Sequence, residues 1–406
     1  MQLKLLNLYR VAAKIATNLV GAFIALIIYQ STNSFAWAFA YIAAFNLFKI
    51  FLHKVLRKAC QTKPQLMLLL KTIPMLLYSF SVLLLDTQLK VLGIFLVLIF
   101  KGLSDTLVMA VEFIYSYNSD DKSSTSTGFT RLMDILGAVI AILIGGLLLD
   151  NIDTWIVIVL SCVIYVIGVI PLCIFALKQR GNKSFNQEST SNAIESYNTN
   201  DLKRHQHKFI SKRVLSRYFL AYILLCSYDA VITLVGLYIF KENACLYSQV
   251  AYISIAYHGM YGIGGMIAGY LDQKKDLTYI VVLSYVVGGI LVCISPFLIN
   301  FIWIEILLYG AVGFMLSFMS LFLYSRLMTR CKIMGIGNQA LSNREISSYL
   351  AQAIAAILCI PGAFMFIPTF FVLGISSIAN GYFVPKNEEV VRRYLVDYLQ
   401  NNNMYQ

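Results

Sequence analysis

Runs of apolar residues recur along the whole chain and are separated by short polar connections. A helix needs about 20 apolar residues, at a rise of about 1.5 Å per residue, to cross a bilayer. The predicted membrane segments are residues 11–30, 35–53, 66–85, 91–116, 131–149, 154–177, 218–240, 249–270, 278–299, 302–325, 346–361 and 364–384. This pattern predicts an all-α membrane protein with twelve transmembrane helices.

A polar stretch at residues 178–217 leaves six predicted segments before it and six after it. The stretch is rich in Ser, Asn and Gln, a composition typical of a largely disordered linker. We therefore predict an N-terminal six-helix bundle over residues 1–177 and a C-terminal six-helix bundle over residues 218–385. Residues 386–406 form a predicted tail.

Basic residues are distributed unevenly between the two sides of the predicted segments. They gather at the N-terminus, after the second segment, in the linker, and after the eighth and tenth segments. The connections on the other side contain only Lys90 and Lys241. Because Lys and Arg are enriched on the cytoplasmic side of membrane proteins, we predict that both termini, the linker and the tail are cytoplasmic.

Composition supports the membrane interpretation and excludes several function classes. Hydrophobic residues make up 59% and charged residues 13% of the 406-residue chain, and the mean hydropathy is +0.73. The net charge of +12 would suggest nucleic-acid binding in a soluble protein. Here the basic residues follow the sidedness of the membrane, so we expect no nucleic-acid partner. The chain has no metal-binding His/Cys motif and no Walker motif, and we expect no metal, no cofactor and no enzymatic activity.

Segment 91–116 carries charged residues within its apolar run. On a helix, Lys101, Asp105 and Glu112 share one face. A charge at the bilayer centre costs about 2.5–3.5 kcal/mol on insertion scales, so such residues usually face a bundle interior or a water-filled cavity. The stripe therefore indicates a transport pathway. The alternative is a Lys101–Asp105 pair that only neutralises itself against a neighbouring helix, which leaves Glu112 unexplained.

The C-terminal half contains polar residues near the middle of two predicted segments. Asp229 and His258 are candidate cavity-lining groups, because a desolvated acid can hold a proton and histidine changes charge near physiological pH. Tyr257 and Tyr261 lie one helical turn apart beside His258, and their rings can bind amphipathic or cationic organic molecules. The alternatives are a neutral His258 bonded to a carbonyl or tyrosine, and an Asp229 that only joins two helices.

The fifth and eleventh segments begin alike. Arg131 starts the fifth and Arg344 precedes the eleventh, and each arginine is followed by a mainly apolar run that starts from the predicted cytoplasmic side. With six segments in each half, this similarity favours a parallel internal repeat. Asp134 and Asp272 lie at the same predicted side. These arginines and aspartates are candidate gating residues.

Glycines in the fifth segment add a family resemblance. They match the spacing of the antiporter motif G-x8-G-x3-G-P-x2-G-G of the major facilitator superfamily: Gly128, Gly137, Gly145 and Gly146. Ala141 and Ile142 replace the middle glycine and the proline. Glycines permit close helix packing where the bilayer supplies no hydrophobic drive between helices. With its six-plus-six pattern, the sequence resembles this superfamily in topology over its whole length.

Two further motifs of the superfamily are partly present. Val97 followed by Lys101 is similar to the fourth-helix motif, with lysine for the usual arginine and Asp105 at the glycine position. Residues 269–275, GYLDQKK, keep the small residue, the acid Asp272 and the bases of the loop signature after the eighth helix, with a spacing one residue short. The loop after the second segment keeps only the basic character of that signature.

The resemblance implies a secondary active transporter that works by alternating access. The charged residues lead us to expect proton-coupled export of a small amphipathic molecule, with Asp105 held ionised by Lys101 and Glu112 relaying the proton. The alternatives are transport of a lipid or lipid-linked headgroup, and a non-transporting sensor or scaffold, which would not need the costly charged stripe. The expected partners are the lipid bilayer, a small-molecule substrate and the proton. The expected location is a bacterial plasma membrane.

Overall fold

The computed structural model of the protein describes residues 2–111, 114, 124–180, 201–242, 246–272, 277–333 and 337–401. All regular structure within these residues is helical. The N-terminal half contains α1 (Gln2–Gly21), α2 (Ile24–Thr32), α3 (Phe35–Thr62), α4 (Pro64–Leu70), α5 (Thr72–Leu83), η1 (Leu84–Asp86), α6 (Lys90–Leu107), α8 (Ser124–Asn151) and α9 (Thr154–Arg180). The C-terminal half contains α11 (Asp201–Glu242), α12 (Tyr247–Asp272), α13 (Thr278–Ile294), η3 (Ser295–Phe297), α14 (Ile302–Ile333), α15 (Gly337–Cys359), η4 (Ala363–Met365) and α16 (Phe366–Asn401).

Helices in the described residues coincide with the predicted apolar segments. Among those residues, eight helices are long and apolar enough to cross a membrane. The outer surface carries large apolar side chains, including Leu307 and Trp303, which are 75% and 73% exposed. A soluble protein rarely leaves so much apolar surface uncovered, whereas lipid tails cover it in a bilayer. The structure therefore supports a multi-pass membrane protein.

Two of the predicted segments are broken helices. The first segment divides between Gly21 and Ile24, where glycine ends α1. The third divides at Lys71, and Pro74 falls in the first turn of α5. A proline costs little there, because the N–H that it lacks would have no partner within the helix. Both divisions lie at buried residues, Phe23 at the first and Lys71 at the second, and helix-type backbone hydrogen bonds run across them.

A turn interrupts segment 91–116 as a helix. Helix α6 ends at Leu107 and a turn follows at Val108. The Thr106 hydroxyl donates a hydrogen bond to the Gly102 carbonyl (2.7 Å), a back-bond that favours bending of helices. Residues 109–111 and 114 are again helical after this turn, and Glu112 lies outside the described residues.

The predicted linker and tail are helical over part of their lengths. Helix α11 begins at Asp201 and α16 continues to Asn401, so residues 201–217 and 386–401 extend the C-terminal half. The extensions pack on each other: Arg217 donates a hydrogen bond to the side-chain oxygen Oδ1 of Asn387 at 2.7 Å, and Val214 and Val391 are buried. The largely disordered linker predicted over 178–217 is thus wrong for residues 201–217.

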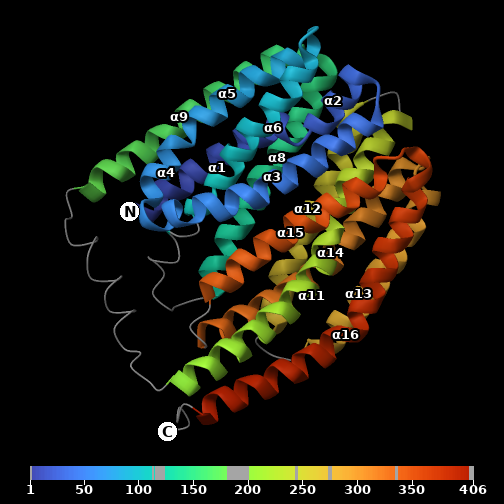
Figure 1. The fold of residues 1–406 in the computed structure, drawn as a ribbon. Helices are drawn as coiled ribbons and strands as arrows, with labels where there is room; N and C mark the ends of the chain where they lie inside the picture. Colours follow the sequence, from blue (N-terminus) through green and yellow to red (C-terminus); the bar gives the residue numbers. More distant parts are fainter. Residues whose placement is uncertain are drawn as a thin grey trace.

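Figure 1 shows the N-terminal helices, in blue to green, as one group and the C-terminal helices, in yellow-green to red, as a second group beside it. Both termini, the end of α9 and the start of α11 lie at one end of the molecule, which we call the linker end (Figure 1). We call the opposite end the far end. The halves contact each other mainly through α8 on α12 and through α3 on α15. A site between the halves is therefore bordered by these helices.

Candidate functional site

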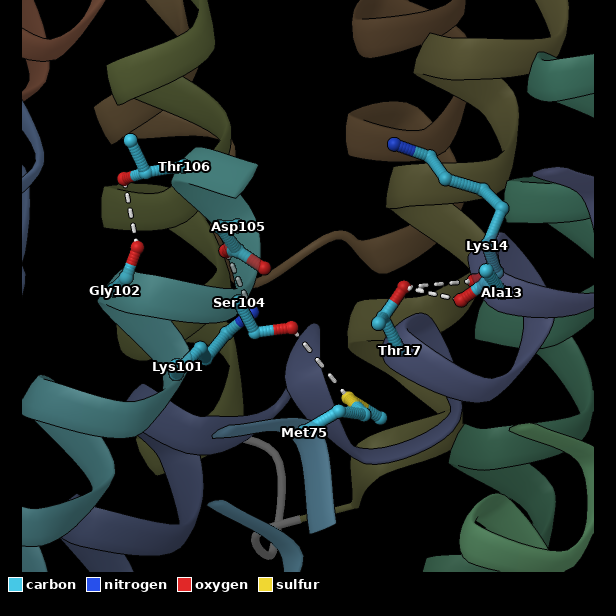
Figure 2. A network of polar contacts seen from close by, with 9 residues as sticks. All are labelled: Ala13, Lys14, Thr17, Met75, Lys101, Gly102, Ser104, Asp105 and Thr106. Carbon is cyan, nitrogen blue, oxygen red and sulfur yellow. Dashed lines mark hydrogen bonds and ion pairs between the residues drawn. The ribbon is translucent and has the colours of Figure 1, made fainter. Parts of the chain in front are cut away.

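The charged pair predicted on α6 forms within the N-terminal half. Lys101 Nζ lies 2.9 Å from Asp105 Oδ2, and the two side chains are 13% and 24% exposed. Figure 2 shows both side chains on α6, with the ion pair as a dashed line. At 1.5 Å per residue, Lys101 lies about 16 Å along the helix from Lys90 at the far end, which is near the middle of a bilayer.

The ammonium group of Lys101 is surrounded by aromatic rings and a helix end. Nζ lies 5.6 Å from the ring centroids of both Phe45 and Tyr78, within reach of cation–π attraction. A Cβ placed on Gly21, the last residue of α1, would lie 3.2 Å from Nζ. The C-terminus of a helix carries partial negative charge and favours a cation. The break between α1 and α2 therefore contributes to holding Lys101 in the membrane interior.

Further lysines from neighbouring elements complete what we call the lysine cluster, defined as Lys14, Lys49, Lys71 and Lys101. Lys49 on α3 and Lys71 between α4 and α5 lie within electrostatic range of Asp105. Lys71 is only 3% exposed, and its Nζ lies 5.7 Å from the Tyr165 ring centroid. Lys14 on α1, seen across from Asp105 in Figure 2, interacts electrostatically with Lys49 and Lys71.

A cavity of about 270 Å³ lies in the C-terminal half beside this cluster. Side chains of α11, α12, α14 and α15 line it, among them the predicted His258, Tyr257, Tyr261 and Arg344. The Tyr261 hydroxyl is 2.8 Å from Ser320 Oγ, which fixes the ring at the cavity wall. The volume approaches the range of small-molecule sites, and the wall combines aromatic rings with a few polar groups, as such sites do.

The cavity and the lysine cluster adjoin each other across the two halves. Lys49 Nζ lies 4.0 Å from the ring centroid of Tyr349, and the Tyr349 hydroxyl donates to Glu345 Oε2 at 3.4 Å. Glu345 lines the cavity. From the other side, Lys14 lies within electrostatic range of His258. The structure therefore brings His258, Tyr257 and Tyr261 to one cavity, and the Lys101–Asp105 pair lies in the adjoining cluster.

At the far end, the two halves are joined by hydrogen bonds and aromatic contacts around the start of α12, which we call the far-end seal. Asp150 on α8 accepts hydrogen bonds from the backbone N–H groups of Tyr247 (2.7 Å) and Ser248 (2.9 Å). The Tyr247 hydroxyl donates to Gln30 of α2, and its ring centroid lies 5.7 Å from that of Phe23. A carboxylate at a helix N-terminus is favourable because it meets unpaired N–H groups and the positive end of the dipole.

Two glycines of the family-like motif on α8 make close contacts. A Cβ on Gly145 would lie 2.3 Å from the Leu19 carbonyl oxygen of α1, and one on Gly146 would lie 2.8 Å from Ala251 Cβ of α12. Gly137 is looser, since its nearest neighbour would be 3.6 Å away. The side-chain environment of Gly128 lies outside the described residues. The helices thus approach closely at Gly145 and Gly146, whereas the space beside Gly137 would admit a Cβ at ordinary contact distance.

Several predicted site residues fall outside the described parts of the chain. This applies to Glu112 as a whole, and to the side chains of Arg131, Asp134, Asp229 and Asp272. Other site residues were not predicted. Lys49, Lys71 and Glu345 border the site, and Asp150 joins the halves. Lys49 and Lys71 are lysines inside predicted membrane segments, and this signal is the same one that identifies Lys101.

Comparisons with known proteins agree with this arrangement. A sequence profile described as Major Facilitator Superfamily matches residues 66–343, more than half of the chain. Among curated proteins, no similar sequence was found. A crystal structure of a bacterial homologue of the iron transporter ferroportin, in an inward-facing state, has the same fold: the TM-score is 0.66 at 12% identity, over 93% of this chain and 98% of that one. The chain thus belongs to the major facilitator superfamily and has the fold of a membrane transporter.

Proposed function

We propose that this protein is a proton-coupled secondary transporter that works by alternating access, with six membrane helices in each half and with both termini in the cytoplasm. The observation that carries the proposal is the Lys101–Asp105 pair, held at 2.9 Å in the last two turns of α6 beside a cavity. Charged side chains at this depth are costly, and they are kept where transport or proton transfer needs them.

Asp105 is the proposed proton-binding group. Its charged and titratable neighbours are Lys101 on α6, Lys49 and Tyr41 on α3, Lys71 at the start of α5, and Tyr78 on α5. While Lys101 lies against the carboxylate, the ionised form is favoured. A movement of the halves that separates the pair removes this support, so that the carboxyl group takes up a proton. Glu112 would then relay the proton, and Asp229 would contact the substrate.

The far-end seal supports an inward-facing state for this structure. Asp150, Tyr247 and Gln30 join the halves at the far end, while the cavity lies among the linker-side parts of α11 and α15. The solved structure of similar fold is also of an inward-facing state. On the linker side, His53 Nε2 of α3 lies 3.0 Å from Ser342 Oγ of α15, so this contact would have to part before the site opens to a cytoplasmic linker end. Arg131, Asp134, Asp272 and Arg344 would then lie at or near the open side.

The proposed cargo is a small amphipathic molecule, and the proposed direction is export from a bacterial cell across its plasma membrane. Aromatic residues of the cavity suit an apolar body, and the partial antiporter motif on α8 favours exchange against a proton. Transport of a lipid headgroup would use the same cavity. A scaffold without transport would gain nothing from the charges.

Reconstitution into proteoliposomes tests the function directly. Vesicles are loaded with a panel of amphipathic compounds, and a proton gradient is imposed with acid outside. We expect outward movement of at least one compound against its gradient, abolished when an ionophore collapses the proton gradient. If no compound moves against its gradient while protein-mediated downhill exchange is intact, proton coupling is refuted.

Sidedness of the two ends is a separate prediction. Lys63, between α3 and α4 at the linker end, and Asp153, between α8 and α9 at the far end, are both exposed. We expect an impermeant thiol reagent, added to intact cells, to modify Asp153→Cys but not Lys63→Cys. Cys60 is unsuitable for this purpose because it is 0% exposed. Modification of Lys63→Cys in intact cells would reverse the proposed topology.

Asp150→Ala should weaken the far-end seal. Loss of the two charge-assisted bonds to α12 removes about 1–2 kcal/mol, a change of about 5–30-fold in the population with an open far end. Spin labels at Asp153→Cys and Glu242→Cys, on opposite halves, report that opening as a longer distance. The control is Asp86→Ala, because Asp86 is an exposed far-end acid that bonds to no described residue of the other half. Equal distance distributions in all variants would show that Asp150 does not hold the halves together.

A further inference from the structure

The described interior between the halves contains more cations than acids. Lys49, which is partly buried, and Lys71, which is 3% exposed, form no ion pair with any described residue, and the described acid beside them, Asp105, is bonded to Lys101. Lys14 also forms no ion pair with a described residue, but its side chain is exposed. On the cavity side, Arg344 and Glu345 offset each other in charge. An ammonium group in the membrane interior is costly unless an anion or water neutralises it. The lysine cluster therefore has a net positive charge that the described residues leave unbalanced.

Hydrogen-bond donors without partners adjoin the same cluster. The side-chain amide nitrogen of Asn18 and the hydroxyls of Tyr41 and Tyr78 are buried and have no partner among the described residues. Asn18 lies one turn after Lys14 on α1. Tyr41 and Tyr78 interact electrostatically with each other and with Asp105. Buried polar groups are nearly always bonded in folded proteins, so orphan donors indicate a missing acceptor.

We propose that the transported molecule carries an anionic head group, such as a carboxylate, sulfonate or phosphate, which the lysine cluster binds. The inference rests on the proposed transport function and specifies its substrate class. Ammonium, phenol and amide groups all donate, and an anion supplies the acceptors that they lack. The apolar body of the molecule occupies the adjoining cavity of about 270 Å³ near Tyr257 and Tyr261.

The same groups disfavour a metal cation as the cargo. Divalent metals bind carboxylates, imidazoles and thiolates. Among the described residues, no group of three or more His, Cys, Asp or Glu side chains could hold such an ion. Lysines repel it as well. The structure of similar fold is named for its homology to an iron transporter, but the shared fold does not extend to this charge pattern.

Two amphiphiles with the same apolar body and opposite charge test the proposal. Naphthalene-2-sulfonate and naphthalen-2-yl-trimethylammonium are titrated into the full-length protein in a neutral detergent, with calorimetry as the readout. We expect the sulfonate to bind at least about tenfold more tightly, the effect of one charge-assisted bond. Equal binding, or tighter binding of the ammonium compound, would overturn the proposal.

Lys49→Gln is the main variant, because it removes one cation and leaves the Lys101–Asp105 pair intact. We expect sulfonate affinity to fall about tenfold and to recover in Lys49→Arg. Lys90→Gln is the matched control, since Lys90 Nζ bonds to the Ser31 carbonyl at the far end. Size-exclusion chromatography confirms that each variant is folded. An unchanged affinity in a folded Lys49→Gln would assign the anion to another site and refute the proposal.

Competition identifies the source of the anion. If short-chain phosphatidylglycerol displaces the sulfonate and phosphatidylcholine does not, the head group belongs to a lipid; if neither does, it belongs to a free anion. Either result supports an anionic head group, and displacement by both lipids contradicts it. The binding titration is done without a proton gradient. A negative binding result therefore counts against the anionic head group alone, and a negative proteoliposome result counts against transport. Uphill movement of a cationic compound would keep the transport function and refute this inference.

Discussion

Asp105→Asn is expected to abolish uphill transport while leaving exchange of substrate across the membrane. Asparagine keeps the shape of the side chain and removes its ionisation, so substrate can still bind and the halves can still move. A pH difference of one unit supplies about 1.4 kcal/mol per proton, enough for about tenfold accumulation by a one-proton transporter. We expect this ratio to fall to about one in the variant, measured with the compound that the wild-type protein concentrates.

Lys101→Ala should fail in a different way. It leaves Asp105 without its nearest cation, although Lys49 and Lys71 remain in electrostatic range. An unpaired charge in the membrane interior costs about 3 kcal/mol on insertion scales, so we expect a lower yield of folded protein. The double variant Lys101→Ala/Asp105→Asn should fold better than Lys101→Ala alone. Removing both charges leaves an uncharged site, which destabilises the fold less than a single unpaired carboxylate in the membrane interior.

The three variants are compared for expression, binding and pH-driven uptake in parallel. If Asp105→Asn still concentrates substrate, Asp105 is not the coupling group, and Glu112 or Asp229 becomes the next candidate. If the double variant gives less folded protein than Lys101→Ala, the unpaired charge of Asp105 is not the cause of the lower folding yield. The results thus separate a role in proton coupling from a role in folding.

The helical membrane fold could be predicted because the length and hydrophobicity of an apolar run are local properties of the sequence and are enough to indicate a membrane helix. Helix ends could not, because they depend on contacts between distant parts of the chain. The polar residues 201–217 are typical of a linker, yet α11 begins at Asp201. About five turns into this helix it is bonded to α16, through Arg217 on Asn387 and Tyr218 on Glu388, residues 170 positions apart in each pair. A single sequence does not reveal such partners.

The candidate site could be predicted only where the charged residues lie close together in sequence. Lys101 and Asp105 are one helical turn apart, and this spacing by itself predicts an ion pair. Lys49 and Lys71 are equally unusual inside apolar segments, but neither has an acid at helical spacing. Their significance depends on α3, α5 and α6 being neighbours, which only the structure shows. The proposal that the amphipathic cargo carries an anionic head group rests on that assembly.

The far-end seal illustrates the same limit. Asp150 ends an apolar helix in the sequence, and nothing nearby suggests a partner. In the structure it caps α12, about one hundred residues later, with both carboxylate oxygens. Residues that join the halves are therefore the hardest to predict, because each makes its contacts outside its own bundle. They are also the residues whose contacts the proposed alternating-access movement would have to break.

Gly145→Leu is expected to abolish transport without preventing membrane insertion. Leucine keeps the segment apolar, so insertion is not impaired. Any Cβ at this position would lie 2.3 Å from the Leu19 carbonyl oxygen, which belongs to the α1 backbone and cannot rotate away. Helix α1 must then move away from α8. Because Gly21 of α1 lies against the Lys101 ammonium group, this movement also disturbs the Lys101 site. Overpacking of this kind costs about 1–3 kcal/mol or more.

Gly137→Ala is the matched control on the same helix pair. A Cβ there would meet Val11 of α1 at 3.6 Å, an ordinary contact, so we expect nearly normal thermal stability and transport. Gly145→Ala should already lower the melting temperature in detergent, and Gly145→Leu should lower it further, while all three variants reach the membrane. Wild-type transport by Gly145→Leu would mean that α1 and α8 tolerate separation. The glycine spacing would then be a coincidence, and the Lys101 site would not depend on the position of α1.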